Sequence, residues 1–177
     1  IEDPEGFDGT LRPYQQRGVA WLAFLGRLGL GACLADDMGL GKTAQLIATV
    51  LADPTPGPTL VVCPVSVLGN WEREIGRFAP GLSLLVHHGA TRTTARTFIR
   101  AAGKADMVLT TYGLVTRDIG HLAEVRWGRI ALDEAQHIKN PRTKTAKATA
   151  ALVAPRRIAL TGTPVENNVG ELWSVME

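Results

Sequence analysis

A glycine-rich segment in the N-terminal half has the residue types that bind phosphate groups. It reads Asp36-Asp37-Met38-Gly39-Leu40-Gly41-Lys42-Thr43 and lies between an apolar run and a helical pattern. Glycines let backbone N–H groups turn towards phosphate oxygens, and the helix start adds a partial positive charge. Lys42 is placed to reach the β- and γ-phosphates of ATP, and Thr43 to offer its hydroxyl to Mg²⁺. The strict phosphate-loop pattern has glycine where this chain has Asp36, so a glycine-rich turn with a solvated lysine stays open as the alternative.

Two adjacent carboxylates, Asp133 and Glu134, follow the apolar run Ile130–Leu132. Asp133 can help to hold Mg²⁺, because a hard cation prefers oxygen ligands. Glu134 can orient and deprotonate an attacking water molecule. An Asp-Glu pair alone is weak evidence, since solvated acidic turns are common. The same pair after an apolar strand, downstream of a phosphate loop, predicts nucleotide hydrolysis with Lys42, Asp133 and Glu134 as the catalytic residues.

A third polar segment, Thr161-Gly162-Thr163-Pro164, follows the apolar run Ile158–Leu160. Its threonine hydroxyls could sense the γ-phosphate or contact Glu134. Glycine and proline also make the segment typical of a plain turn, and taken by itself a turn is the simpler interpretation.

Short apolar runs alternate with longer helical patterns along the chain, which predicts a parallel α/β sheet with right-handed crossovers. Continuous apolar runs are typical of strands that are covered on both faces. The predicted strands are Ala32–Ala35, Thr59–Cys63, Leu82–Val86, Met107–Thr110, Ile130–Leu132 and Ile158–Leu160. In such sheets ligands bind beyond the carboxyl ends of the strands, which is where the polar segments lie.

Two of the intervening segments have amphipathic patterns. Ser66 can cap a helix whose apolar stripe consists of Val67, Leu68, Trp71, Ile75 and Phe78. A second helix has one apolar face made of Ala95, Phe98, Ile99 and Ala102. Four basic residues repeat every four positions beside that face, at Arg92, Arg96, Arg100 and Lys104. On a helix they would form one basic strip, which either tracks a duplex or is a solvated face.

The composition is that of an ordinary globular domain, with 45% hydrophobic and 20% charged residues in 177 positions. A net charge of +2 does not by itself indicate a nucleic-acid binder, so a basic surface must come from local clustering. Cys33 and Cys63 are too far apart for a metal-binding pair and predict reduced core cysteines of an intracellular protein. No apolar run reaches membrane-spanning length, and we expect no membrane partner.

Together these segments resemble the SWI/SNF-type DNA translocases of helicase superfamily two. The match covers nearly the whole chain, in order, at Leu11–Gln15, Asp36–Thr43, Val61–Pro64, Thr110–Gly113, Asp133–Asn140 and Leu160–Trp173. Asp-Asp-Met-Gly-Leu-Gly-Lys-Thr is close to a signature of that family, so Asp36 is no defect within it. The ending Asp-Glu-Ala-Gln resembles bacterial and archaeal members, because eukaryotic remodellers usually have His at position 136.

The resemblance implies a RecA-like P-loop NTPase domain, with residues 1–177 as one helicase ATP-binding domain. ATP and Mg²⁺ would bind in a cleft shared with a second RecA-like lobe, and we expect the chain to be excised from a longer parent. Gln15 would read the adenine edge, with Arg12 and Tyr14 nearby, although a plain glutamine at a helix start is the alternative. The implied nucleotide contacts are Arg12, Gln15, Met38, Gly39, Leu40, Gly41, Lys42 and Thr43, and the implied magnesium ligands are Thr43 and Asp133.

The resemblance also implies movement along double-stranded DNA without necessarily separating its strands. In the family, segments that match Pro64–Ser66 and Thr110–Gly113 contact the phosphate backbone, for which hydroxyls, backbone N–H groups and helix N-termini are suited. Further polar and basic residues beside the acidic pair are Lys139, Asn140, Arg142, Lys144 and Lys147. We expect a cytoplasmic, nucleoid-associated protein of a bacterium or archaeon.

Two alternatives stay open. One is a strand-separating DNA or RNA helicase, although Thr161-Gly162-Thr163 argues against the RNA type, whose corresponding segment usually reads Ser-Ala-Thr. The other is a nucleotide-binding interaction module without turnover, against which Lys42, Asp133 and Glu134 favour an active parent. The chain by itself is expected to be nearly inert, because family members place arginines of the second lobe against the γ-phosphate, and an arginine finger contributes about 10³–10⁵ in rate. Arg156 and Arg157 precede the last strand and should lie at the opposite end of the sheet.

Overall fold

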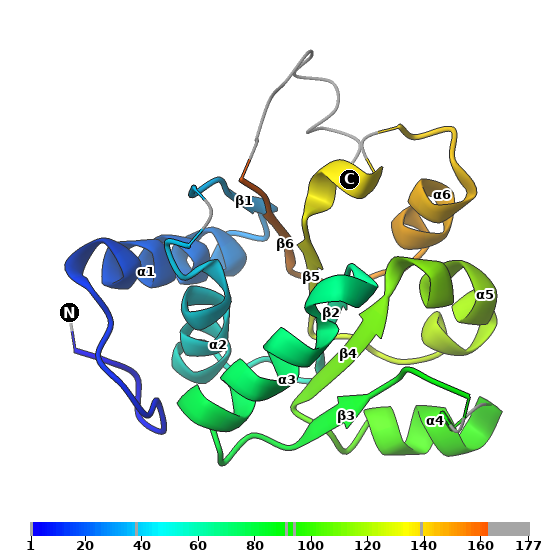
Figure 1. Ribbon diagram of the computed structural model, residues 1–177, viewed down its shortest axis with the longest axis horizontal. Coiled ribbons are helices and arrows are strands. Elements are labelled where there is room, and N and C mark those ends of the chain that lie inside the picture. Colours follow the sequence, from blue (N-terminus) through cyan, green and yellow to red (C-terminus); the bar gives the residue numbers. More distant parts are fainter. Residues whose placement is uncertain (1, 38, 91, 94, 139, 163–177) are drawn as a thin grey trace.

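The structure is a computed structural model that describes residues 2–37, 39–90, 92–93, 95–138 and 140–162. Within these residues, six parallel strands form one sheet in the order β1-β6-β5-β2-β4-β3 (Figure 1). The strands are β1 (Ala32–Leu34), β2 (Thr59–Cys63), β3 (Leu84–Val86), β4 (Met107–Thr111), β5 (Arg129–Asp133) and β6 (Arg157–Leu160). The parallel α/β fold predicted from the sequence is therefore confirmed, and every predicted strand is present.

Backbone pairing, rather than the polarity of the side chains, decides where the strands end. The apolar run Ile130–Leu132 is extended to Asp133 at its carboxyl end, because Asp133 pairs in register with Leu160 of β6. Conversely, β3 begins at Leu84 and not at Leu82, since its pairing with β4 starts where Leu84 lies opposite Met107.

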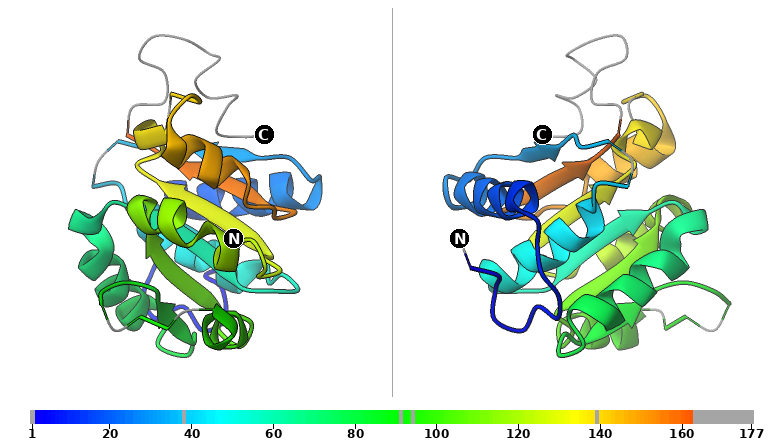
Figure 2. Two further views of the ribbon diagram at one scale, coloured as in Figure 1. Left: turned by 90° about the vertical axis from the view of Figure 1, so that its right-hand side faces the viewer. Right: turned by 60° about the vertical axis from the view of Figure 1, so that its left-hand side comes forward.

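Helices cover both faces of the sheet, with three α-helices on each within the described residues, and a short 3-10 helix, η1 (Ala135–Ile138), packs in the same core as α5 (Figures 1 and 2). On one face lie α1 (Pro13–Arg27), α2 (Lys42–Ala52) and α3 (Val65–Phe78), and on the other lie α4 (Ala95–Ala102), α5 (Tyr112–Leu122) and α6 (Lys144–Ala150). Strand side chains alternate between two apolar cores, so that Val61 packs with the first three helices and its neighbours Leu60 and Val62 with the others. Among the described helices none has the length and apolar character that crossing a bilayer requires.

The predicted amphipathic helix after β2 is present as α3, with Leu68, Trp71 and Ile75 buried on its inner face. The predicted cap is wrong, however. Pro64 is the N-cap, and Ser66 is an exposed residue of the first turn that caps nothing. The reason is the short connection from β2. The strand ends at Cys63, and Pro64, with φ −60° and ψ 147°, turns the chain directly into the helix.

The predicted basic strip is also wrong as a four-residue feature, because α4 is shorter than the pattern. Phe98 and Ala102 are fully buried, which confirms the apolar face. Arg96 and Arg100 are exposed on α4, whereas Lys104 lies beyond its end. Arg92 lies before the helix and is directed towards α5.

Arg92 belongs to a buried ion-pair cluster between the β3–α4 connection and α5. Its Nε donates to Oδ2 of Asp118 at 2.8 Å, and Nε2 of His87 lies 2.9 Å from the same oxygen. The Arg92 guanidinium is the main cause that holds the pKa of Asp118 below its usual value. Burial lowers the pKa of His87, so His87 favours its neutral form. The cluster fixes α5 at Asp118, whose backbone departs from helical angles.

Asp118→Asn is expected to lower the free energy of unfolding by about 2 kcal/mol at pH 7, because it removes the charged acceptor of Arg92 and His87. The folded-state pKa of Asp118 is lowered. The ionised carboxylate therefore contributes fully to the free energy of unfolding above the ordinary pKa of aspartate, and this contribution is lost as the pH falls through the folded-state pKa. Urea unfolding of both proteins between pH 7 and pH 3 should therefore show a difference that shrinks only at the acidic end. The exposed Glu124, as Glu124→Gln, is the control. A difference that stays constant with pH would contradict the ionic role.

Candidate active site

The polar segments predicted from the sequence leave the sheet at its carboxyl edge. The glycine-rich loop follows β1, the Asp133-Glu134 pair ends β5, and Thr161 follows β6. Because β6 lies between β1 and β5, the three segments are neighbours (Figure 1). Burial raises the pKa of Asp133, and the Lys42 ammonium, close enough to act on it, opposes that shift. Thr163 and Pro164 lie outside the described residues.

The loop before α2 has the backbone that its glycines predict. Gly39 and Gly41 have φ of 85° and 76°, in the left-handed region that favours glycine. At Gly41 a Cβ atom would also collide with the side-chain amide of Gln15. Gly41 is the N-cap of α2, so the loop leads directly into a helix start. This arrangement suits an anion, because first-turn N–H groups have no helical acceptor. Met38 lies outside the described residues.

Lys42 and Asp36 hold the two ends of this loop together. The Lys42 Nζ donates to the carbonyl oxygens of Asp36 and Asp37 at 2.7 and 3.2 Å. The Asp36 carboxylate accepts from the Gln45 amide of α2 at 2.8 Å, and Gln45 is completely buried. Asp36 therefore makes a bond that glycine could not make. Gln45 was not singled out from the sequence, since a buried glutamine in an apolar helix has no local signature.

The first turn of α1 contacts the loop from the other side. Gln15 Nε2 and Tyr14 Oη both donate to the Leu40 carbonyl oxygen, at 3.1 and 3.2 Å. The side-chain Oε1 of Gln15 accepts from the backbone N–H of Arg12 at 2.8 Å, so Gln15 also stabilises the start of α1. The structure thus brings Tyr14 and Gln15 to the loop, and the Arg12 backbone is bonded to Gln15.

Asp133 is nearly buried, with 8% of its surface exposed, and each of its carboxylate oxygens accepts one hydrogen bond. Trp71 Nε1 donates to Oδ2 at 2.7 Å, and the Glu134 backbone N–H donates to Oδ1 at 3.0 Å. Tyr112 Oη donates to the Asp133 carbonyl oxygen at 2.7 Å. The sequence predicted Trp71 only as part of an apolar stripe and Tyr112 only within the DNA-contacting segment Thr110–Gly113, because neither pattern reveals a hydrogen bond to Asp133.

Glu134 has φ 49°, which is left-handed backbone on a residue other than glycine. Such a conformation costs roughly 1–2 kcal/mol and is found mainly at functional sites. The Glu134 carboxylate accepts from Nε2 of the Gln136 side chain, and Oε1 of the same side chain accepts from the Thr161 hydroxyl at 2.8 Å. Thr161 is therefore linked to Glu134 through Gln136.

The donor set fits a magnesium ion that is shared with phosphate groups. Among the described residues, no group of three or more His, Cys, Asp or Glu side chains could enclose a metal. Mg²⁺ keeps several waters and is usually held by one or two carboxylates together with substrate phosphates. A single buried carboxylate beside a phosphate-type loop matches that pattern.

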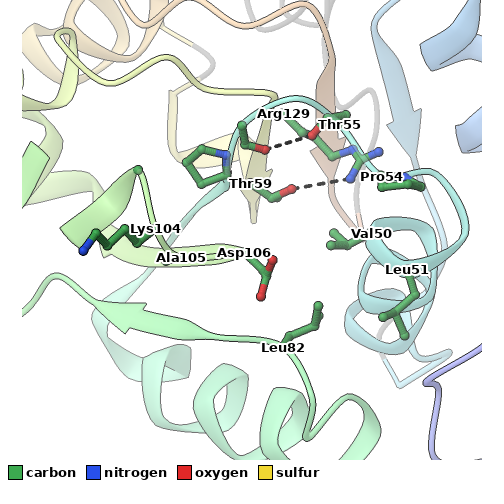
Figure 3. Close-up of a pocket in the computed structure, with 13 residues that line it drawn as sticks. Val50, Leu51, Pro54, Thr55, Thr59, Leu82, Lys104, Ala105, Asp106 and Arg129 are labelled. Carbon is green, nitrogen blue, oxygen red and sulfur yellow. Dashed lines mark hydrogen bonds between the residues drawn. The ribbon is translucent and has the colours of Figure 1, made fainter. Parts of the chain in front are cut away.

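A cavity of about 350 Å³ lies at the opposite, amino edge of the sheet and does not include these residues (Figure 3). Its lining includes Thr59 and the fully buried Arg129, which are hydrogen-bonded to each other. Arg129 and Arg156 both pair with Asp53 at the end of α2. Arg156 and Arg157 thus lie at the edge opposite the loop, as predicted.

The family model of the SNF2-related domain matches residues 14–177. The chain belongs to this family. Other members of similar sequence include the Bacillus subtilis protein YwqA, named as a candidate ATP-dependent helicase/translocase. It is 51% identical over 97% of this chain and 19% of its own length. The TATA-binding protein-associated factor MOT1 of Saccharomyces cerevisiae is 39% identical over 98% of this chain and 10% of its own length.

A solved SNF2-family structure has the same fold. The Sulfolobus solfataricus SWI2/SNF2 ATPase core in complex with dsDNA matches with a TM-score of 0.87 and 49% identity, over 99% of this chain and 36% of that chain. The chain thus spans about a third of that ATPase core and a fifth or less of the curated relatives. The resemblance to SWI/SNF-type proteins and the RecA-like fold predicted from the sequence are confirmed.

Glu134→Gly is expected to be more stable than Glu134→Ala by about 1 kcal/mol, because both lose the side chain and only glycine relieves the left-handed backbone. Urea unfolding of the two variants measures the difference. At the exposed Glu124, where φ is not positive, the same pair of substitutions should show no advantage for glycine. Equal stability of the two Glu134 variants would show that this backbone is not strained.

Proposed function

We propose that this chain is the ATP-binding and hydrolysing lobe of a motor that moves along double-stranded DNA. The observation that carries the proposal is the meeting of the loop, Lys42 and the Asp133-Glu134 pair at one edge of β1, β6 and β5. Membership of the SNF2-related family and the likeness to an ATPase core that was solved with dsDNA support it. ATP with Mg²⁺ is the proposed cofactor.

The proposed catalytic residues are Lys42, Asp133 and Glu134. Lys42 binds the β- and γ-phosphates by exchanging its bonds to the loop carbonyls for phosphate oxygens. Thr43 and Asp133 hold Mg²⁺, which when bound neutralises charge on the phosphates. Glu134 orients the attacking water and accepts its proton, and the Gln136 amide fixes its carboxylate.

The remaining nucleotide contacts are proposed for the loop and the start of α1. Backbone N–H groups of Gly39, Leu40 and Gly41 face the phosphates, and Gln15 reads the adenine edge with Arg12 beside it. Met38, part of the predicted set, lies outside the described residues. Because Gln15 already bonds to Leu40, adenine recognition and loop position are linked through one side chain.

Residues 1–177 are proposed to form one ATP-binding domain that needs a second RecA-like lobe for turnover. Arg156, which precedes β6, and Arg157, the first residue of β6, lie at the far edge of the sheet and cannot reach the γ-phosphate. We therefore expect turnover by the chain alone to remain near background. Since duplex DNA is the proposed track, the proposed location is the nucleoid in the cytoplasm.

The proposed DNA contacts are the starts of α3 and α5. Ser66 and Gly113 are exposed in the first turns of these helices, whose N-terminal N–H groups suit phosphate oxygens. Thr110 and Thr111 are buried, and the Thr110 hydroxyl bonds to the His87 carbonyl oxygen, so α5 offers backbone donors instead of these hydroxyls. Further proposed contacts are the exposed Asn140, Arg142, Lys144 and Lys147, and Lys139 lies outside the described residues.

Lys42→Ala is expected to weaken ATP binding about 100-fold, because one charge-assisted contact contributes a few kcal/mol and each 1.4 kcal/mol is about tenfold. Calorimetric titration with Mg-ATP measures the change. Arg27→Ala, at an exposed position in the last turn of α1, is the control for loss of a surface cation and should bind like wild type.

Glu134→Gln should bind Mg-ATP normally and abolish DNA-stimulated phosphate release in the parent protein, because it removes the base and keeps the shape.

If Lys42→Ala bound Mg-ATP as well as the wild-type chain does, the phosphate loop would be misassigned.

Gly113→Asp is expected to lower the affinity for duplex DNA about tenfold at low salt, because it adds a negative charge to the proposed phosphate site. The position accepts a side chain, since a Cβ there meets no atom within 4 Å. Gly113→Asn is the neutral match, and Gly120→Asp puts the same charge on an equally open position near the other end of α5. Fluorescence anisotropy at several salt concentrations should show a wild-type log–log slope of about −0.9 per phosphate contact. Equal losses for Gly113→Asp and Gly120→Asp would reject this site.

A further inference from the structure

Asp133 is the point where two helices from different parts of the chain meet the candidate site. Trp71 belongs to α3 and holds the Asp133 carboxylate, while Tyr112 is the first residue of α5 and holds the Asp133 backbone carbonyl. Each bond measures 2.7 Å. The starts of these two helices are the proposed DNA contacts. Each contact segment is therefore connected to the proposed magnesium ligand Asp133 through a residue of its own helix.

The two bonds are shielded from water. Trp71 is 1% exposed and Tyr112 is 9% exposed. A buried acceptor that loses its donor in such surroundings finds no solvent substitute, so these two donors, together with the Glu134 backbone N–H, decide how Asp133 is oriented. The carboxylate still has free lone pairs, because each oxygen can accept two bonds and accepts one here. Asp133 is therefore fixed in direction while a cation can still bind it.

The connection from DNA contact to Asp133 is short and rigid in both helices. Trp71 lies in the second turn of α3, six residues after Val65 at its start, which corresponds to a rise of about 9 Å. Tyr112 directly precedes Gly113, the exposed residue of the proposed phosphate contact. A shift of either helix start moves its donor, because an α-helix moves as a unit over such distances.

We propose that Trp71 and Tyr112 are positioning residues, through which duplex contact at α3 and α5 sets the orientation of Asp133 towards Mg²⁺. The inference rests on the proposed function. It gives the two aromatic side chains a role beyond core packing, as the physical link between the DNA-contacting surface and the metal site. Binding of duplex and binding of Mg-ATP are then coupled, and the coupling is reciprocal.

The test is a magnesium titration of the chain with a fluorescent ATP analogue, with and without a short duplex. Trp71→Phe replaces the indole with a smaller aromatic ring that has no N–H donor, and Tyr112→Phe removes only the hydroxyl. For Trp71→Phe we expect the Mg²⁺ concentration at half-saturation to rise about tenfold. For both variants, the factor by which duplex changes that concentration should fall towards one. Affinity for the analogue without Mg²⁺ should stay unchanged, because Lys42 and the loop bind the phosphates, and a merely structural loss would lower it.

Trp127→Phe is the matched control. Trp127 is 3% exposed, and its Nε1 donates to the Leu122 carbonyl oxygen at 2.8 Å, away from the candidate site. It loses the same kind of bond from a buried indole and should keep the wild-type magnesium titration. If it shifts the titration as much as Trp71→Phe does, the effect is one of stability and the proposal is overturned.

Wild-type values for half-saturation and for coupling in both variants would also overturn the proposal. If Trp71→Phe does not unfold cooperatively, Tyr112→Phe decides alone, since it loses a single oxygen atom. A failure of the proposed function gives a different result: Lys42→Ala and the wild-type chain would bind the analogue with equal affinity. In that case both the proposed function and the positioning role of Trp71 and Tyr112 would be rejected.

Discussion

Parallel alignment of the strands is the constraint on which the candidate site depends. Because every strand runs in the same direction, each one delivers its following segment to the same edge of the sheet. Lys42 and Asp133 lie far apart in the sequence and on different elements, and the common strand direction brings them to the same edge. The return connections meet at the opposite edge, where Asp53 pairs with Arg129 and Arg156. The candidate site and the ion pairs of Asp53 thus lie at opposite edges of the sheet.

Placing Asp133 at the end of a central strand has an electrostatic cost. Burial raises its pKa, and Glu134 next to it acts in the same direction, while the Trp71 indole and the Glu134 backbone N–H favour the ionised form. The site therefore needs those donors to hold a charge at a nearly dry position. Burial, with Asp133 nearby, also raises the pKa of Cys63 to about 12. Cys63 thus stays a neutral thiol that packs in the core, in agreement with its expected role.

Local patterns in the sequence were sufficient for the strands and for the positions of the glycine-rich loop and the acidic pair, since each depends on neighbouring residues. They were insufficient where a distant partner decides. Ser66 looked like a helix cap, but the short connection from β2 gives that position to Pro64. Arg92 fitted a helical repeat, but its guanidinium pairs with Asp118. Trp71 fitted an apolar stripe equally well as a core residue and as a donor, and only its partner 62 positions away distinguishes the two.

The departure at Asp36 shows which glycines of the loop the backbone requires. Gly39 and Gly41 have positive φ. Among the described residues, Glu134 is the only residue other than glycine with a positive φ. Asp36 has no such angle, so a side chain is allowed there, and its carboxylate bonds to Gln45. Its backbone carbonyl oxygen accepts from the Lys42 ammonium group. The side chain of Asp36 thus holds the loop to α2 by a bond that does not depend on Lys42, and glycine at position 36 could not make that bond.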